Sequence, residues 1–292
     1  MRCATLNVLH GRRLRSDGRP APAADDVPWW PLADAVAALD ADVLALQEVD
    51  RFQDRSGRVD QAAVAADAMG APDWRYASAL HGRQVPGRGW VLDPSRPGPN
   101  LYGPRDTDQA DAVPSHGVAL LSRLPVREWR VLRLSPAPLR LPLRVAGNPG
   151  FALSRDQPRA AVAAVLDGGQ GPFTAVALHL SFVPGWNIGQ LLRVRRWIAA
   201  LPRPQLLLGD FNLTGALPRA VLNGATPGPR PGREPADRWR DLARAPTYPA
   251  HRPIVQLDHV LARGVAADAV RSASAPVLGI SDHRPLVVEL SP

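Results

Sequence analysis

The sequence predicts a mixed α/β sandwich, and two observations predict it. Short apolar runs bounded by turn residues recur along the chain, which is typical of buried strands. Helical patterns stand between only some of these runs, which does not fit a strict β-α-β series. The apolar runs cover 3–8, 42–47, 117–122, 159–166, 173–180, 205–208, 257–261 and 285–290.

Three segments show the spacing of amphipathic helices. The first follows Pro31, a residue favoured at the first helical position. The second covers 58–69 and stops at Gly70, a frequent helix end. The third carries arginines on its more exposed positions. The apolar positions are Leu32, Val36 and Leu39 in the first helix, and Ile188, Leu191, Leu192, Ile198 and Leu201 in the third.

Two stretches, 82–115 and 224–253, are rich in Gly, Pro and charged residues and are expected to be long loops. Loops of that length in a compact domain are usually functional or disordered. Neither stretch divides the chain convincingly, and no internal repeat is visible. We therefore expect one domain over residues 1–292.

Composition narrows the class of protein. The chain is 45% hydrophobic and has a net charge of +8, with arginine supplying every basic residue. That charge favours anionic partners such as phosphates, nucleic acid or acidic lipid. No apolar run reaches the roughly 20 residues of a membrane-spanning helix. The opening "MRCATLNVLHG" has no leader pattern, and the single Cys3 excludes an internal disulfide, so a cytoplasmic location is expected.

Polar residues occur at or near the ends of several apolar runs. The stretch "LLLGDFNLT" ends a strand with Asp210 and Asn212, and "VLALQEVD" ends one with Gln47 and Glu48. Each such residue has a simpler explanation: a turn, a solvated strand end, or a buried histidine with satisfied partners. The complete set is Asn7, Glu48, His179, Asp210, Asn212, Asp258, Asp282 and His283.

A sheet gathers the ends of its strands at one rim, so these scattered positions can meet in one cleft. Carboxylate and amide oxygens without cysteine suit Mg²⁺ or Mn²⁺ rather than structural zinc. An acid next to a histidine can fix its tautomer and raise its basicity.

The ordered motifs resemble the endonuclease/exonuclease/phosphatase superfamily. That group includes DNase I-like nucleases, abasic-site endonucleases, inositol polyphosphate 5-phosphatases and neutral sphingomyelinases. The motifs are "TLNVLHG", "LQEVD", "GVALLSRLPV", "PRAAVAAVL", "HLS", "LLGDFN", "LDHVL" and "SDHRPL", and they span residues 4 to 286. The resemblance implies a four-layer α/β/β/α sandwich, with two mainly antiparallel sheets face to face and helices outside. It also implies Mg²⁺-dependent phosphoester hydrolysis, with Mn²⁺ as an alternative ion.

The resemblance assigns the metal side of the site to Glu48, assisted by Asn7, with Asp282 as a further carboxylate. Asp210 would position or deprotonate the attacking water, and Asn212 would hold a phosphate oxygen.

On the phosphate side, the resemblance implies that His283 stabilises the transition state or the leaving group, with Asp258 orienting it. His179 matches a second active-site histidine of the family, and Arg159 a phosphate-side arginine. Around Gly117 the chain departs from many bacterial relatives, because it has His116 and Val118 there. Tyr102 is the candidate for a phosphate-contacting tyrosine.

The substrate class stays open at this stage. A nuclease-like phosphodiesterase is favoured, and it needs basic loops flanking the site. Candidate arginines are Arg83, Arg88, Arg96, Arg105, Arg230 and Arg233, diluted by Asp93, Asp106, Asp108 and Asp111. A phospholipid or sphingolipid phosphodiesterase would need exposed apolar residues, for which Trp90, Val91 and Leu92 are candidates. An inositol-type small-molecule phosphatase and a catalytically silent binding scaffold stay open as well. No obligate protein partner is expected.

Overall fold

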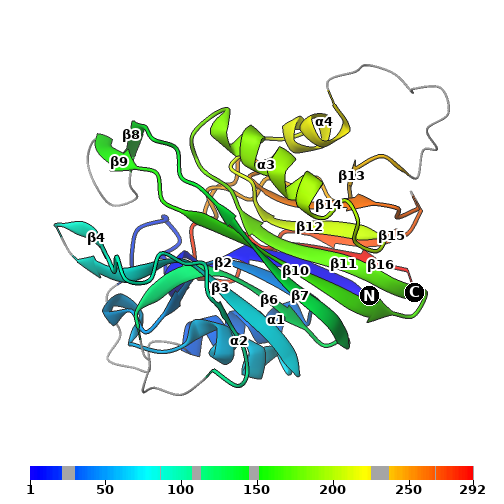
Figure 1. Ribbon diagram of the computed structural model, residues 1–292, viewed down its shortest axis with the longest axis horizontal. Helices are drawn as coiled ribbons and strands as arrows, with labels where there is room; N and C mark the ends of the chain where they lie inside the picture. The colour runs from blue at the N-terminus through cyan, green and yellow to red at the C-terminus, as the bar shows by residue number, and fades with distance from the viewer. Residues whose placement is uncertain are drawn as a thin grey trace.

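The computed structural model describes residues 1–21, 30–85, 87–106, 113–144, 151–224, 237–266 and 268–291. Two sheets stacked face to face form its centre, and helices cover their outer faces (Figure 1). This arrangement confirms the expected four-layer sandwich. No helix in the described residues is long and apolar enough to cross a membrane.

The first sheet has eight strands in the order β15-β16-β1-β2-β6-β3-β4, with β5 also paired to β3. Only β1 and β2 run parallel; the other pairs in this sheet are antiparallel. The strands are β1 (Arg2–Asn7), β2 (Val43–Arg51), β3 (Asp73–Val85), β4 (Gly89–Leu92), β5 (Leu101–Tyr102), β6 (Ser115–Ser122), β15 (Val270–Ser274) and β16 (Leu286–Leu290).

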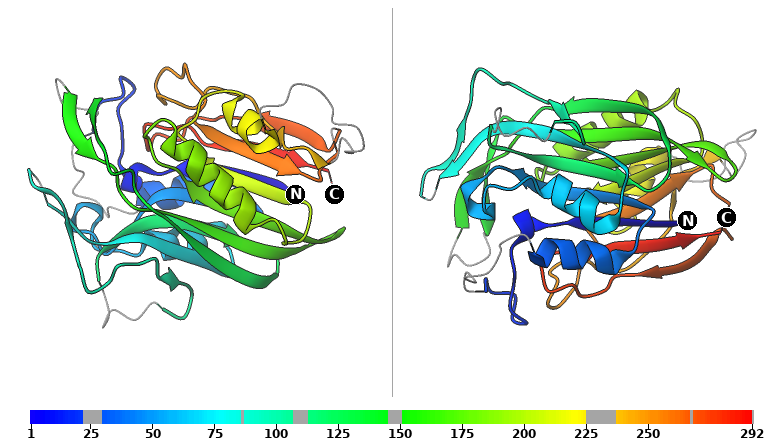
Figure 2. Two further views of the ribbon diagram at one scale, coloured as in Figure 1. Left: turned by 45° about the horizontal axis from the view of Figure 1, so that its top comes forward. Right: turned by 90° about the horizontal axis from the view of Figure 1, so that it is seen from below.

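The second sheet has six strands in the order β13-β14-β12-β11-β10-β7. Here β11 and β12 run parallel and the remaining pairs antiparallel. The strands are β7 (Val126–Leu134), β10 (Arg159–Gly168), β11 (Gly171–His179), β12 (Gln205–Asp210), β13 (Arg240–Asp241) and β14 (Asp258–Arg263). A separate hairpin, β8 (Arg140–Arg144) with β9 (Phe151–Arg155), projects from one end of the molecule (Figures 1 and 2).

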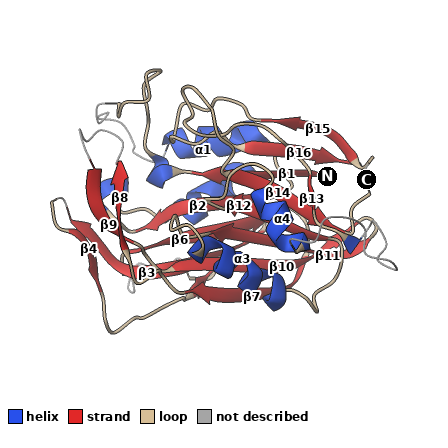
Figure 3. Ribbon diagram, turned by 90° about the horizontal axis from the view of Figure 1, so that it is seen from above, coloured by secondary structure: helices blue, strands red, loops and turns tan. Residues whose placement is uncertain are grey.

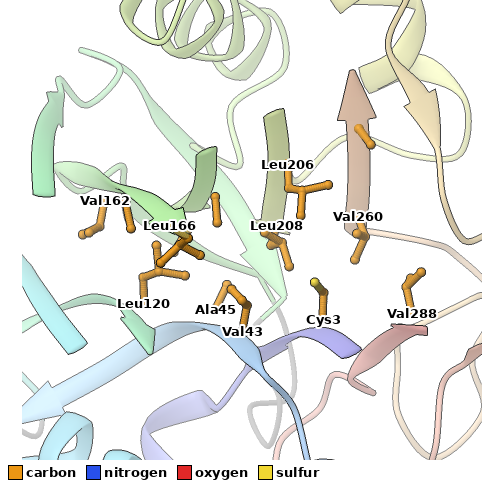
Figure 4. Close-up of a cluster of buried hydrophobic side chains, with 14 of the residues drawn as sticks. Cys3, Val43, Ala45, Leu120, Val162, Leu166, Leu206, Leu208, Val260 and Val288 are labelled. Atoms are coloured by element: carbon orange, nitrogen blue, oxygen red, sulfur yellow. The ribbon is translucent and has the colours of Figure 1, made fainter. Parts of the chain in front are cut away.

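Each central strand is buried on both faces because the two sheets stack and helices cover them. In β2, Val43 and Ala45 face the second sheet while Leu44 and Leu46 face the helices, as the period of two requires. The core between the sheets is filled by small and medium aliphatic side chains, with Cys3 among them (Figure 4). This packing brings the strand ends of both sheets to one common rim.

In the part of the chain that the structure describes, four helices complete the outer layers. Against the first sheet lie α1 (Trp30–Leu39) and α2 (Gln61–Met69), and against the second lie α3 (Trp186–Trp197) and α4 (Leu217–Asn223) (Figures 2 and 3). The expected helix at 58–69 begins only at Gln61, because the Asp60 carboxylate caps it by accepting from the amides of Ala62 and Ala63. The third helix ends at Trp197 rather than Leu201.

The expectation of a long loop over 82–115 was wrong for residues 82–92, which form a hairpin, and for the short strand at 101–102. Strand β3 continues to Val85 and turns back into β4, and β5 adds a short pair to β3. The prediction failed there because backbone pairing between β3 and β4 tolerates glycine, which stands at Gly82 and Gly89. Within 224–253, β13 occupies two residues. Asp108, Asp111, Arg230 and Arg233 lie outside the described residues.

Candidate active site

The candidate site lies where strand ends of both sheets meet. Asn7 ends β1, His179 ends β11 and Asp210 ends β12. Asp258 begins β14, which is antiparallel to β12, so Asp210 and Asp258 are cross-strand partners. His179 is likewise the register partner of Asp210 across the parallel pair. Residues more than 200 positions apart along the chain are thereby brought into contact.

Glu48 reaches this rim through a break in the alternation of β2. The expectation that β2 ends at Gln47 and Glu48 was wrong, because the strand runs on to Arg51. Glu48 instead has φ of 55°, and the register with β6 shifts between Gln47 and Val49. Such a bulge turns one side chain away from its regular face, which is a frequent device next to active sites.

Asp210 is at the centre of the site. Its Oδ2 accepts a hydrogen bond from Asn7 Nδ2 at 3.1 Å, and its Oδ1 accepts one from the amide of Asn212 at 2.9 Å. His179 Nε2 lies 3.5 Å from the same Oδ2. Burial raises the pKa of Asp210 to about 7, with Asp258 adding to the effect and His283 opposing it. This carboxyl group therefore exchanges its proton near neutral pH.

Asn7 links Asp210 to Glu48. The same amide nitrogen also donates to Glu48 Oε1 at 3.2 Å, while the amide oxygen accepts from the backbone N–H of Leu9. Burial raises the pKa of Glu48, but the attraction of His116 and Arg159 outweighs it, so that the pKa lies below its ordinary value. Glu48 is thus held as a carboxylate.

His283 and Asp258 form a buried pair. His283 Nδ1 lies 2.8 Å from Asp258 Oδ2, and its Nε2 lies 3.8 Å from Asp210 Oδ2. Burial lowers the pKa of His283, but the carboxylates, chiefly Asp258, prevail and raise it to about 10. The ring is therefore an imidazolium at neutral pH. Ser281 supports the loop by donating to the Asn7 carbonyl at 2.6 Å and accepting from the His283 amide.

The pKa of His179 is shifted in the direction opposite to that of His283. Burial, together with Arg159, lowers its pKa well below the ordinary value. Arg159 Nη1 lies 3.1 Å from His179 Nδ1, and because a guanidinium only donates, Nδ1 must accept. The ring proton then sits on Nε2, the nitrogen near Asp210. Asn212 is fixed alongside, since its side-chain nitrogen donates to the carbonyl of Leu180 at 3.0 Å.

Asp282 completes the acidic side of the site. Burial raises its pKa, and the charge of Glu48 adds to the rise while His283 opposes it. Among the described residues, the compact group of carboxylate and imidazole atoms, within 4.8 Å of one another, is Asp210, Asp258 and His283. The predicted metal side, Asn7, Glu48 and Asp282, lies next to this group rather than within it.

Sequence reasoning missed Tyr248, whose ring centre lies 5.0 Å from that of His283. Burial raises its pKa, and the charges of Asp282 and Asp210 raise it further. Nothing in the stretch 224–253 marked this residue. Tyr102, the predicted candidate, instead lies 2.9 Å from His81 Nε2 and its ring is covered by the Arg51 guanidinium.

His116 was also not assigned a role. Its Nδ1 lies 2.7 Å from Asp50 Oδ1, and Asp50 receives two hydrogen bonds from Arg55, at 2.7 and 2.8 Å. Asp50, the acid of this buried cluster, follows Glu48 by two residues in the chain.

Comparison with known proteins identifies relatives of this fold. The model of the Endonuclease/Exonuclease/phosphatase family matches residues 4–283. A crystal structure of an endonuclease/exonuclease/phosphatase from Beutenbergia cavernae DSM 12333 is 21% identical, with a TM-score of 0.57 over 100% of this chain and 72% of that one. Comparison with the curated proteins gave no match.

Two further structures have named activities or ligands. The Bacteroides thetaiotaomicron mannosyl-6-phosphatase Bt3783 is 16% identical, with a TM-score of 0.52 and full coverage of both chains. TDP2 of D. rerio, complexed with a single strand DNA product, is 13% identical, with a TM-score of 0.55 over 100% of this chain and 99% of that one. At these identities the likeness concerns the fold.

Proposed function

Because the chain belongs to the endonuclease/exonuclease/phosphatase family, a family of phosphoester hydrolases, we propose that it cleaves a phosphodiester by metal-assisted attack of water. We propose that residues 1–292 form one catalytic domain and that its substrate is nucleic acid. The observation that carries the proposal is the meeting of Asn7, His179 and His283 around Asp210.

Asp210 is proposed to orient the attacking water and accept its proton. With a pKa of about 7, it can hold that proton and release it at neutral pH, as a general base must. Its two oxygens are fixed by Asn7 and by the Asn212 amide, so little reorganisation is needed when a substrate binds.

His283 is proposed to stabilise the charge that builds on the phosphoryl group or the leaving oxygen. It carries a positive charge at neutral pH and is oriented by Asp258, whose hydrogen bond fixes the ring. Asn212, His179 and Arg159 are proposed to bind the non-bridging phosphate oxygens. The Nε of Arg159 is buried with no partner among the described residues, which leaves a donor available for a ligand.

The donor set suits a hard divalent cation. Glu48, Asp282 and Asn7 would hold Mg²⁺, or Mn²⁺ in its place, through oxygen atoms. The raised pKa of Asp282 reflects burial and the nearby negative charge of Glu48, which a bound cation would relieve. When bound, such an ion polarises the phosphoryl oxygen and stabilises the leaving group.

A cytoplasmic location of the protein remains a prediction.

A lipid phosphodiesterase is the second candidate, and one observation favours it. Val91 and Leu92 on β4 expose 45% and 51% of their surface, and neighbouring apolar side chains of this kind can insert into a lipid surface. Trp90 packs instead on His116, with ring centres 5.2 Å apart, and beneath the Arg55 guanidinium. A small phosphomonoester is the third, since a relative of this fold is a mannosyl-6-phosphatase.

The deciding experiment is nicking of supercoiled plasmid with Mg²⁺ by the wild type, His283→Ala and Asp210→Asn at low and high salt. We expect nicking by the wild type only, weaker at high salt and abolished by EDTA. An exposed arginine on the outer helix α3, Arg196→Ala, is the control. Turnover of sphingomyelin or of a sugar phosphate without plasmid nicking would reassign the substrate. Unchanged turnover in both site variants would refute the site.

A further inference from the structure

A cavity lies beside the candidate site. It has a volume of about 360 Å³ and is lined by His10, Gly11, Arg12, Arg55, Ser56 and Gln84. We call it the Arg12 pocket. None of these lining residues carries a carboxylate, whereas two have guanidinium groups.

The pocket shares its walls with the catalytic machinery. His10 and Gly11 belong to the short 3-10 helix Leu9–Gly11, which is separated from Asn7 by Val8 alone. The carbonyl of Arg12 accepts a hydrogen bond of 2.9 Å from the Ser281 amide, in the last catalytic loop. Arg55 is bound to Asp50, two residues beyond Glu48. The pocket therefore lies between the Glu48 bulge and the loop that carries His283.

The pocket presents hydrogen-bonding atoms that have no partner among the described residues. Arg55 is clamped by Asp50 through Nε and Nη2, which leaves its Nη1 without a hydrogen bond among the described residues. The Arg12 side chain is exposed and has no hydrogen bond or ion pair there either. His10 Nδ1 is buried and has no hydrogen-bond partner in the described part of the chain. Burial and the nearby Arg55 lower the pKa of His10 to about 4, so the ring is neutral and has one N–H to donate.

These features select the class of ligand. Buried polar atoms without partners are rare in folded proteins, and a ligand is one explanation for them. Arginine forks match the geometry of phosphate oxygens. The charge of Asp50 offsets that of Arg55, but no lining carboxylate offsets Arg12. The cavity is at the small end of the range for ligand pockets, so it suits one phosphate and its attachment rather than a large group.

We propose that the Arg12 pocket binds a second phosphate of the substrate, the one next to the phosphoester that is cleaved. This inference rests on the proposed function and narrows it to substrates with two neighbouring phosphates. The second phosphate is either the adjoining phosphodiester of a nucleic acid strand or a further phosphate of a small polyphosphorylated molecule.

Binding is measured by calorimetry in the Asp210→Asn background, which prevents turnover, and repeated with the wild type in EDTA. The probes are thymidine 5′-monophosphate, thymidine 3′,5′-bisphosphate and myo-inositol 4,5-bisphosphate. Arg12→Glu is compared with Arg196→Glu on α3, which makes the same charge change far from the pocket. Arg12 has no side-chain partner to lose, so its variant should melt with the parent protein.

We expect a bisphosphate to bind at least about tenfold tighter than the monophosphate, the ratio expected of one added charge-assisted contact. Arg12→Glu should remove this preference and Arg196→Glu should retain it. Tighter binding of the thymidine bisphosphate assigns the pocket to nucleic acid, and tighter binding of the inositol bisphosphate assigns it to a small substrate.

Equal affinity for mono- and bisphosphate, or equal losses in the two variants, would overturn the inference. The wild type is also assayed for turnover with Mg²⁺. Plasmid nicking without a bisphosphate preference would leave the proposed function intact and reject the pocket. A bisphosphate preference without turnover of any phosphoester would reject the proposed function and leave the pocket as a phosphate-binding site.

Discussion

Gly209→Ala tests how the fold positions the site, because Gly209 directly precedes Asp210 in β12. A Cβ built at Gly209 would lie 2.9 Å from the Leu178 carbonyl carbon, and closer still to its oxygen. Unstrained carbon contacts are about 3.5 Å or longer, so β11 and β12 would have to separate by at least about 0.6 Å. The hydrogen bond from the Leu180 amide to the Asp210 carbonyl, now 3.0 Å, would then be lost.

The expected cost is about 3 kcal/mol, from overpacking plus the lost hydrogen bond. For a chain of this size that corresponds to a fall in melting temperature of about 5–10 °C. The folded fraction should also lose at least about 100-fold in rate, because Asp210 would move relative to Asn7 and His179.

The matched control is Gly189→Ala on α3, where a Cβ would meet nothing within 4 Å. It should leave activity unchanged and raise stability slightly, since alanine is favoured over glycine in helices by about 1 kcal/mol. Melting is followed by circular dichroism and activity by phosphoester hydrolysis. A Gly209→Ala protein that melts with the wild type and keeps its rate would refute the reasoning.

Three further outcomes are expected. Asp258→Asn should lower the pKa of His283 and reduce the rate by about 100-fold or more, and the double variant with His283→Ala should be no worse than His283→Ala alone; additive losses in this double-mutant cycle would contradict the pairing. The rate should rise with pH through the pKa of Asp210, about 7, because only the ionised form of this carboxyl group accepts a proton. A rate that does not change between about pH 5 and pH 9, about two units either side of that pKa, would speak against Asp210 as the base. Asp60→Ala should cost about 3–5 kcal/mol in urea unfolding, because it removes the cap of α2 and leaves the buried Arg51 guanidinium without its 2.8 Å partner; a loss under about 1 kcal/mol would show that the pair contributes little.

The fold class could be predicted from local sequence patterns, because the spacing of apolar residues in a strand or helix reflects which of its faces are buried. The alternation in β2 and the spacing of Leu32, Val36 and Leu39 each depend on a few neighbouring residues. Element ends were harder to predict. The cap at Asp60 and the continuation of β3 into a hairpin depend on hydrogen bonds that composition does not reveal.

Most residues of the candidate site could likewise be named from the sequence, since polar residues at the ends of apolar strands are conspicuous. Their roles stay predictions, and their contacts are a property of the tertiary structure. The bulge that turns Glu48, and the opposite charge states favoured for His179 and His283, arise from burial and from neighbours brought in by other strands.

The sequence by itself determined which residue types stand at strand ends, and so the kind of chemistry available. Only the tertiary structure decided that Tyr248 adjoins His283, that His116 pairs with Asp50, and that Arg12 and Arg55 share a cavity. The physical reason is the separation along the chain over which each feature is determined. Periodicity is set by residues within a few positions, whereas a site depends on side chains that meet only when two sheets stack.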